Sequence, residues 1–182
     1  MRVPRALLAL ALAAACLAAP AQQAERPNSV LLVARPGLED PNFVRTVVLA
    51  TQREDGTTLG VILNRPTDEE HEGHPLWFGG PVLRQSLIAL MDSPEPPKAA
   101  AFHILKDVYL TMHPLNIDAL LANPGAHYRL FAGFAGWAPG QLEDELRREA
   151  WYVLPADEAL LFRDDPEALW KELVARAARP HV

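Results

Sequence analysis

The sequence has 182 residues, with 17 Lys and Arg against 23 Asp and Glu, so its formal net charge at pH 7 is -6. This acidic balance argues against a protein that binds nucleic acid nonspecifically, because such binding needs a basic surface that releases counterions from phosphates. Hydrophobic residues make up 49% and charged residues 22% of the chain, which is ordinary for a globular domain and argues against intrinsic disorder.

The N-terminus has the features of a secretory signal peptide over residues 1–21. Arg2 and Arg5 give it a positive start, an apolar run follows, and Ala19-Pro20-Ala21 supplies the small residues of a signal peptidase site. We therefore expect cleavage after this motif, a short polar leader over 22–28, and a mature chain in the periplasm or outside the cell. The apolar run is too short to span a bilayer comfortably, so we expect no membrane span in the mature chain.

Cys16 is the only cysteine of the sequence. An alternative to cleavage near Ala21 is a lipoprotein anchored through Cys16, although Leu12 lies one position too early for a lipoprotein signal. Cleavage at Ala21 removes Cys16 and two arginines, which leaves a mature chain with no cysteine and a net charge of -8. Such a chain has no thiol for a nucleophile, a disulfide or a thiolate metal site.

The predicted domain, over 29–178, begins with an antiparallel meander. Short runs rich in Val and Leu, bounded by residues that favour turns, predict strands over 29–34, 44–52 and 58–63. Asp55-Gly56 suits a tight hairpin between the last two strands, because glycine adopts positive φ without a steric cost.

Polar loops and short strands alternate in the middle of the chain. The stretch Thr67–His74 is acidic and has no apolar period, so we predict a loop there. Further strands are predicted over 86–91, 101–105 and 108–111. A helix is predicted over 115–122, and its buried face would contain Leu115, Ala119 and Ala122.

The last third of the chain is more regular. Strands are predicted over 128–134 and 151–154, and helices over 139–148 and 166–178. In the closing helix Leu169, Leu173 and Ala177 recur every four residues, and Asp165 precedes it as an expected N-cap. Strands interspersed with short helices and hairpins predict a single α+β domain with a largely antiparallel or mixed sheet.

The short motifs of common enzyme classes, such as G-x-S-x-G, the P-loop and H-E-x-x-H, are missing from the sequence. His71 and His74 lie among four carboxylates in the 67–74 segment, and these side chains suit zinc or manganese. However, no predicted helix or strand holds them at a fixed geometry. The favoured interpretation is therefore a solvated acidic loop with no metal, and no cofactor is predicted.

A glycine-rich corner joins the predicted strand at 128–134 to the helix that follows it. Three glycines allow a sharp turn, and the first N–H groups of the helix could face an anion. Acidic residues in the first turns already complement the helix dipole and would repel an anion. We therefore predict a structural corner in which Trp137 packs as an anchor and Gly136 is sensitive to substitution.

Four motifs follow one another along the chain: 35–43, 60–66, 78–82, and 133–146 followed by Trp151. In this order they resemble the YqgE/AlgH family of bacterial proteins, and the resemblance covers residues 29–175. It implies a single α+β domain whose biochemical activity is not established, and a family name that reflects alginate regulation. It supplies no catalytic residues. We nominate eight matching positions as a shared surface for a ligand or partner: Asp40, Asn64, Arg65, Gly79, Gly80, Trp137, Gln141 and Glu145.

The chain departs from this family in two respects. Family members are usually cytosolic, whereas this chain begins with an export signal. The helical segment expected between Asn64-Arg65-Pro66 and Gly79-Gly80-Pro81 is shortened here to the 67–74 loop.

These observations favour a non-catalytic binding or accessory module outside the cytoplasm, whose partner is an unknown protein or small molecule. One alternative is a metal-assisted hydrolase in which His71 and His74 hold a metal that activates water. Another is a transcriptional regulator, as the family name implies. The acidic net charge disfavours that alternative, because few cations remain for phosphate contacts.

Overall fold

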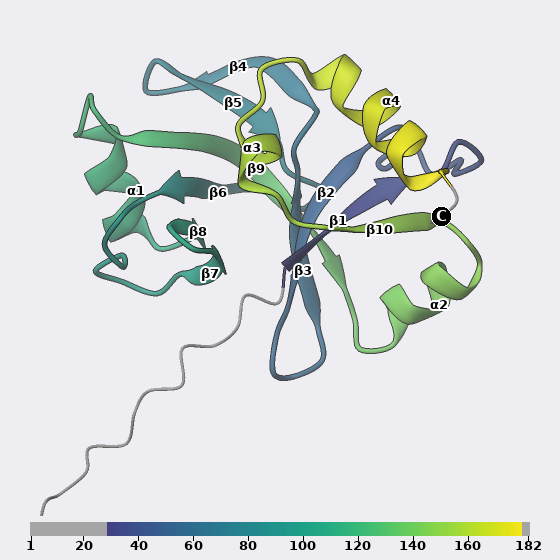
Figure 1. Ribbon diagram of the computed structural model, residues 1–182. Helices are drawn as coiled ribbons and strands as arrows, with labels where there is room; N and C mark the ends of the chain where they lie inside the picture. Colours follow the sequence, from purple (N-terminus) through teal and green to yellow (C-terminus); the bar gives the residue numbers. More distant parts are fainter. Residues whose placement is uncertain (1–28, 180–182) are drawn as a thin grey trace, which may run out of the picture.

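A curled, largely antiparallel sheet organises residues 29–179, the part of the chain that the structure, a computed structural model, describes (Figure 1). The predicted signal peptide, the leader and Cys16 lie outside the described residues. The strands are β1 (Ser29–Ala34), β2 (Val47–Gln52), β3 (Thr58–Ile62), β4 (Pro66–His71), β5 (His74–Phe78), β6 (Val82–Asp92), β7 (Phe102–Leu105), β8 (Val108–Thr111), β9 (His127–Trp137) and β10 (Trp151–Pro155). The helices are α1 (Pro114–Leu121), α2 (Gln141–Arg147), α3 (Glu158–Leu161) and α4 (Pro166–Ala177). The predicted α+β class is confirmed.

The strand order is β10-β1-β2-β3-β9-β6-β8-β7, and β4 and β5 form a hairpin attached to β9. Among the described strands, β5 runs parallel to β9, and the other pairs are antiparallel. The long strand β9 pairs with β3, β5 and β6, so it connects the two halves of the sheet. Strand β1 lies between β2 and β10, which brings the two ends of the domain together.

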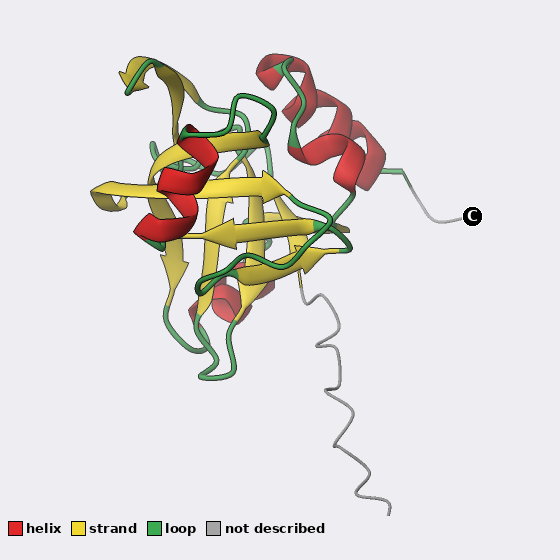
Figure 2. Ribbon diagram, turned by 90° about the vertical axis from the view of Figure 1, so that its left-hand side faces the viewer, coloured by secondary structure: helices red, strands yellow, loops and turns green. Residues whose placement is uncertain are grey.

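Both faces of the sheet are covered because its central strands are apolar on both sides. Alternate residues of β1 enter different clusters: Leu31 packs in one and Leu32 in the other, and both are almost completely buried. α3 and α4 cover the first cluster, and α2 covers the second. A third cluster lies under α1. Figure 2 shows the helices around the outside of the curled strands.

The loop predicted over 67–74 is wrong. These residues form most of a β-hairpin. Strands β4 and β5 pair with His71 opposite His74, and the turn between them has positive φ at Glu72 (51°) and Gly73 (80°). Five of the six residues of β4 are exposed, so no buried face imposes an apolar alternation. Backbone pairing with β5 holds this strand, and sequence patterns cannot show such pairing.

Several predicted boundaries differ from the structure, and the backbone explains two of them. β2 begins at Val47 rather than at residue 44, because Arg45 has a φ of 56° and ends the turns that precede the strand. α2 begins at Gln141, because Gly140 has a left-handed φ of 80° at the N-cap. β9 continues to Trp137, so the corner begins three residues later than expected.

Two predictions about helices are wrong in detail. In α1 the buried apolar residues are Ile117 and Leu120. The three residues placed on the buried face by their spacing, Leu115, Ala119 and Ala122, are all exposed, Leu115 to 67%. Asp165 is the N-cap residue of α4, but its side chain makes no capping bond because its carboxylate accepts N–H groups of Arg163. The short helix α3 was not predicted.

Candidate functional site

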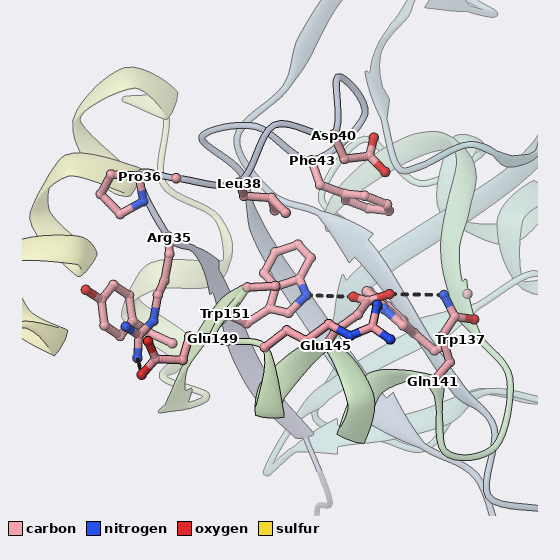
Figure 3. A pocket seen from close by; sticks show the side chains of 15 residues that line it. Arg35, Pro36, Leu38, Asp40, Phe43, Trp137, Gln141, Glu145, Glu149 and Trp151 are labelled. Carbon is pink, nitrogen blue, oxygen red and sulfur yellow. Dashed lines mark hydrogen bonds and ion pairs between the residues drawn. The ribbon is translucent and has the colours of Figure 1, made fainter.

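A cleft of about 720 Å³ lies between the segment that follows β1, residues 35–43, and helix α2 (Figure 3). Its floor is the end of β9 and the start of β10, which contribute Trp137 and Trp151. Four of the nominated residues line this cleft: Asp40, Trp137, Gln141 and Glu145. We call it the α2 cleft.

The carboxylate of Glu145 organises the wall of the α2 cleft. Its Oε2 atom accepts the indole N–H of Trp137 at 3.0 Å and that of Trp151 at 2.8 Å. Its Oε1 atom accepts the side-chain amide of Gln141 at 3.0 Å. Each tryptophan is only 3% exposed, so the carboxylate satisfies N–H groups that have little access to water.

Phe43 completes an aromatic cluster with the two tryptophans. Its ring stacks on Trp137 with 5.9 Å between centroids and forms a T-shaped pair with Trp151 with 5.6 Å between centroids. These separations are typical of favourable aromatic pairs. In Figure 3 the Trp151 ring lies below Leu38 and Phe43, so aromatic and aliphatic groups line the centre of the cleft.

Arg65 holds the segment that carries Phe43. Its guanidinium donates to the carbonyl oxygens of Asn42 at 2.8 Å and Val44 at 3.1 Å. Burial lowers the pKa of Arg65, and the nearby Asp40 carboxylate opposes this shift. The same turn is closed by Asp40, whose side chain accepts the N–H of Asn42 at 2.8 Å. Phe43 is therefore presented from a braced turn.

Charged groups surround the rim of the α2 cleft. The guanidinium of Arg35 lies 4.2 Å from the ring centroid of Tyr152 and 3.6 Å from the carboxylate of Glu149. Glu149 has a φ of 59°, an uncommon conformation for a residue with a side chain. Arg148 also lines the cleft, and among the described residues no carboxylate lies within ion-pair distance of it.

The other four nominated residues lie outside the α2 cleft. Asn64 accepts the N–H of Val47 at 2.8 Å and donates to the carbonyl of Arg45 at 2.9 Å, so with Arg65 it braces the far side of the same turn. Gly79 and Gly80 are buried where the chain crosses β9. A Cβ atom at Gly79 would lie 2.1 Å from the carbonyl oxygen of Gly133, and one at Gly80 would lie 2.2 Å from the backbone of Phe134.

His71 and His74 lie opposite each other at the end of the β4–β5 hairpin. The Nδ1 atom of His74 is 2.9 Å from the hydroxyl of Tyr128, on the neighbouring strand β9. Over residues 29–179, no three or more His, Cys, Asp and Glu side chains are grouped as metal ligands. The structure therefore gives the two histidines a fixed scaffold without a third protein ligand beside them.

Comparison with known protein families shows that residues 31–181 match a family described as AlgH-like. The chain belongs to the AlgH-like family. A UPF0301 protein of Streptomyces avermitilis is 37% identical over 162 residues, which cover 80% of this chain and 84% of that protein. A UPF0301 protein of Thioalkalivibrio sulfidiphilus is 33% identical over 161 residues, which cover 80% of this chain and 86% of that protein.

Solved structures are similar to this AlgH-like protein over most of its length. The solution structure of the AlgH protein from Pseudomonas aeruginosa matches with a TM-score of 0.67 and 28% identity, covering 88% of this chain and 92% of that one. A crystal structure of a protein from Corynebacterium diphtheriae matches with a TM-score of 0.68 and 26% identity, covering 85% and 88%. The family resemblance of the motifs is thus confirmed.

Several residues of the α2 cleft in this AlgH-like protein were not nominated from the sequence, above all Phe43, Trp151 and Arg35. All three belong to the motifs on which the family resemblance rests, and this membership was the sequence feature that could have led to their nomination. An aromatic residue in an apolar strand is usually core, so Trp151 alone gave no indication of a cleft.

Over residues 29–179 no helix has the length and apolar character needed to span a membrane.

Proposed function

We propose that this AlgH-like protein is a binding protein whose α2 cleft takes a small organic ligand with an apolar, preferably aromatic, part. The observation that carries the proposal is the carboxylate of Glu145, which fixes Trp137 and Trp151 against a cleft of about 720 Å³. Ligand pockets in proteins typically measure about 300 to 1,000 Å³ and are largely preformed. A wall locked by hydrogen bonds loses little entropy when a ligand binds.

The chemistry of the cleft supports binding rather than catalysis. The lining among the described residues contains no histidine, serine or threonine. Glu145 accepts three N–H groups, which occupy most of its acceptor positions, so its carboxylate is committed to holding the two indoles and Gln141 in place. The exposed guanidinium of Arg148 and the carboxylate of Asp40 can orient the polar groups of a ligand whose apolar part contacts Leu38 and Phe43.

We also propose that the protein acts outside the cytoplasm after loss of residues 1–21. The support is the sequence of the N-terminus: a positive start, an apolar run and small residues at the end of that run. No feature of the structure favours the hydrolase or the regulator as a second candidate.

The test is a screen of small aromatic and aliphatic compounds against the purified protein, read by NMR. The indole N–H signals of Trp137 and Trp151 report on the α2 cleft, and that of Trp77 is an internal control from another pocket. We expect a subset of compounds to shift the two cleft signals saturably, and Leu38→Ala to weaken binding. Leu83→Ala, at a 61% exposed position outside the cleft lining, is the matched control.

Two results would overturn the proposal. One is a complete screen in which no compound shifts the Trp137 and Trp151 signals saturably. The other is chemical conversion of a bound compound, because turnover would make the protein an enzyme.

A further inference from the structure

A second pocket, of about 430 Å³, lies between the turn that precedes β2 and the start of α4. Trp170 forms part of its wall, together with Val44 and two prolines, Pro66 and Pro166. The Trp170 indole donates to the carbonyl of Ala34 at 2.8 Å, so the ring is fixed to the end of β1. We call this the Trp170 pocket.

The Trp170 pocket is basic in an otherwise acidic protein. Arg45, Arg65 and Lys171 line it, against a single acidic residue, Glu167, whereas the whole chain has a net charge of -6. Among the described residues, no carboxylate lies within ion-pair distance of the three cations. The negative charge of Asp40 favours the protonated form of Arg65, but Asp40 is absent from the pocket lining.

The cations come from three parts of the chain that the fold holds together. Asn64 donates to the carbonyl of Arg45 at 2.9 Å and to that of Pro166 at 3.4 Å, which joins the turn to α4. Arg65 is anchored by the backbone carbonyls of the turn. Arg45 has a left-handed φ of 56°, and its guanidinium lies 5.8 Å from the Trp170 ring centroid. Uncommon backbone conformations of this kind persist only where surrounding contacts enforce them.

We propose that the Trp170 pocket binds an oxyanion, a phosphate or a carboxylate, carried on a ring or short apolar chain. Guanidinium groups bind both oxyanions through paired, charge-assisted hydrogen bonds, and lysine adds a point charge. The apolar part of the ligand contacts Trp170 and Pro66, as the mixed lining requires. This site is separate from the α2 cleft and does not depend on the function proposed for it.

The test uses three aromatic probes of similar size, phenyl phosphate, benzoate and benzyl alcohol, together with inorganic phosphate, all at constant ionic strength. The readout is the indole N–H signal of Trp170 in the full chain, with Trp77, Trp137 and Trp151 as internal controls. We expect phenyl phosphate or benzoate to shift the Trp170 signal saturably and benzyl alcohol to bind at least about tenfold more weakly. The order of phenyl phosphate and benzoate identifies the preferred head group, and inorganic phosphate measures the anion alone.

Variants distinguish specific binding in the Trp170 pocket from nonspecific electrostatic attraction of anions to the protein. Arg45→Gln and Lys171→Gln should each weaken the binding of the anionic probes by about tenfold, because a charge-assisted bond is lost. Lys106→Gln removes one charge at a distant exposed position and should leave binding unchanged. Unchanged indole signals of the other tryptophans show that each variant is folded. Equal binding of phenyl phosphate and benzyl alcohol, or equal weakening by Lys106→Gln, would overturn the proposal.

Discussion

Trp137 and Trp151 donate their indole N–H groups to the same carboxylate oxygen, Oε2 of Glu145, at 3.0 and 2.8 Å. One tryptophan ends β9 and the other begins β10, and the glutamate lies on the helix between them. This shared acceptor therefore closes the β9–α2–β10 connection on itself. Both tryptophans are nearly inaccessible to water, so their N–H groups need an acceptor within the protein. The two hydrogen bonds to Glu145 therefore allow the indoles to be buried at this position.

Removal of this carboxylate should destabilise the protein strongly. Glu145→Ala leaves two buried indole N–H groups without an acceptor, at a cost of about 1 to 3 kcal/mol each. We expect the free energy of unfolding to fall by about 2 to 5 kcal/mol, measured by urea denaturation. Glu143→Ala, at an exposed position of the same helix, should change it by at most about 1 kcal/mol. A Glu145→Ala protein as stable as its Glu143→Ala counterpart would contradict this account of the corner.

Of the glycines in the 133–146 motif, Gly133, within β9, should tolerate a side chain less well than Gly136, the position predicted from the sequence to be sensitive. Gly133 has a φ of 69°, and a Cβ atom there would lie 2.6 Å from the carbonyl oxygen of Gly80. At Gly136 the nearest atom would be a ring carbon of Phe134 at 3.3 Å, in a side chain that can move. We therefore expect Gly133→Ala to lower the melting temperature by several degrees, with a cost of at least about 1 to 3 kcal/mol. Gly136→Ala should cost less, and thermal unfolding of the two variants side by side decides between them.

The β2–β3 hairpin should lose a pH-dependent stabilisation when Thr57 is changed. Hydrogen bonds from the Thr57 side chain, then from its backbone N–H, hold the pKa of Asp55 below its ordinary value of 3.8. A carboxyl group with a lowered folded pKa stabilises the protein above its unfolded pKa, and this contribution disappears as the pH falls through the folded pKa. In Thr57→Val the Asp55 pKa should rise toward its ordinary value, as measured by carboxyl NMR titration.

The same variant provides a check on stability. Its loss of unfolding free energy relative to the parent protein should be present near neutral pH and vanish in acid, where the carboxyl group is protonated in both states. A loss that is equal at both pH values would assign it to packing of Thr57 and not to Asp55.

If the protein is exported as proposed, its N-terminus in the native cell should be shortened by cleavage of the signal peptide. N-terminal sequencing of the protein from its native cell should find residues 1–21 removed and a chain that begins near Gln22. Metabolic labelling with a fatty acid tests the alternative anchor at Cys16. Recovery of the full-length chain from the cytosol would refute export, and a labelled Cys16 would establish the lipoprotein.

Regular elements with buried apolar faces were predictable from the sequence, and elements held by backbone pairing were not. β1, β3 and the β7–β8 hairpin are close to their predicted positions because runs of apolar residues fill the core. β4 has no buried face, so its sequence resembles a loop. The buried face of α1 was misassigned because the position of a short helix on the sheet is decided by contacts with distant strands.

The candidate site was predictable in part. The match to the family motif nominated Trp137, Gln141 and Glu145, which lie together in the α2 cleft, whereas the glycine corner alone was interpreted as structural. Asn64 and Arg65 form hydrogen bonds that hold the turn before β2, outside the cleft. Gly79 and Gly80 allow the chain to pass close to the backbone of β9. One motif-based set thus divides among three places, because neighbours in a motif can face opposite sides of a strand or turn.

The position of β1 has a consequence for the time course of folding. β1 leaves the ribosome first among the described strands, yet one of its two neighbours is β10, the last strand of the sheet. Until Pro155 has been synthesised, β1 cannot be paired on both sides, and pairings between such distant segments form slowly. A chain without β10 therefore leaves one apolar edge of β1 unpaired, and completion of the sheet waits for its final strand.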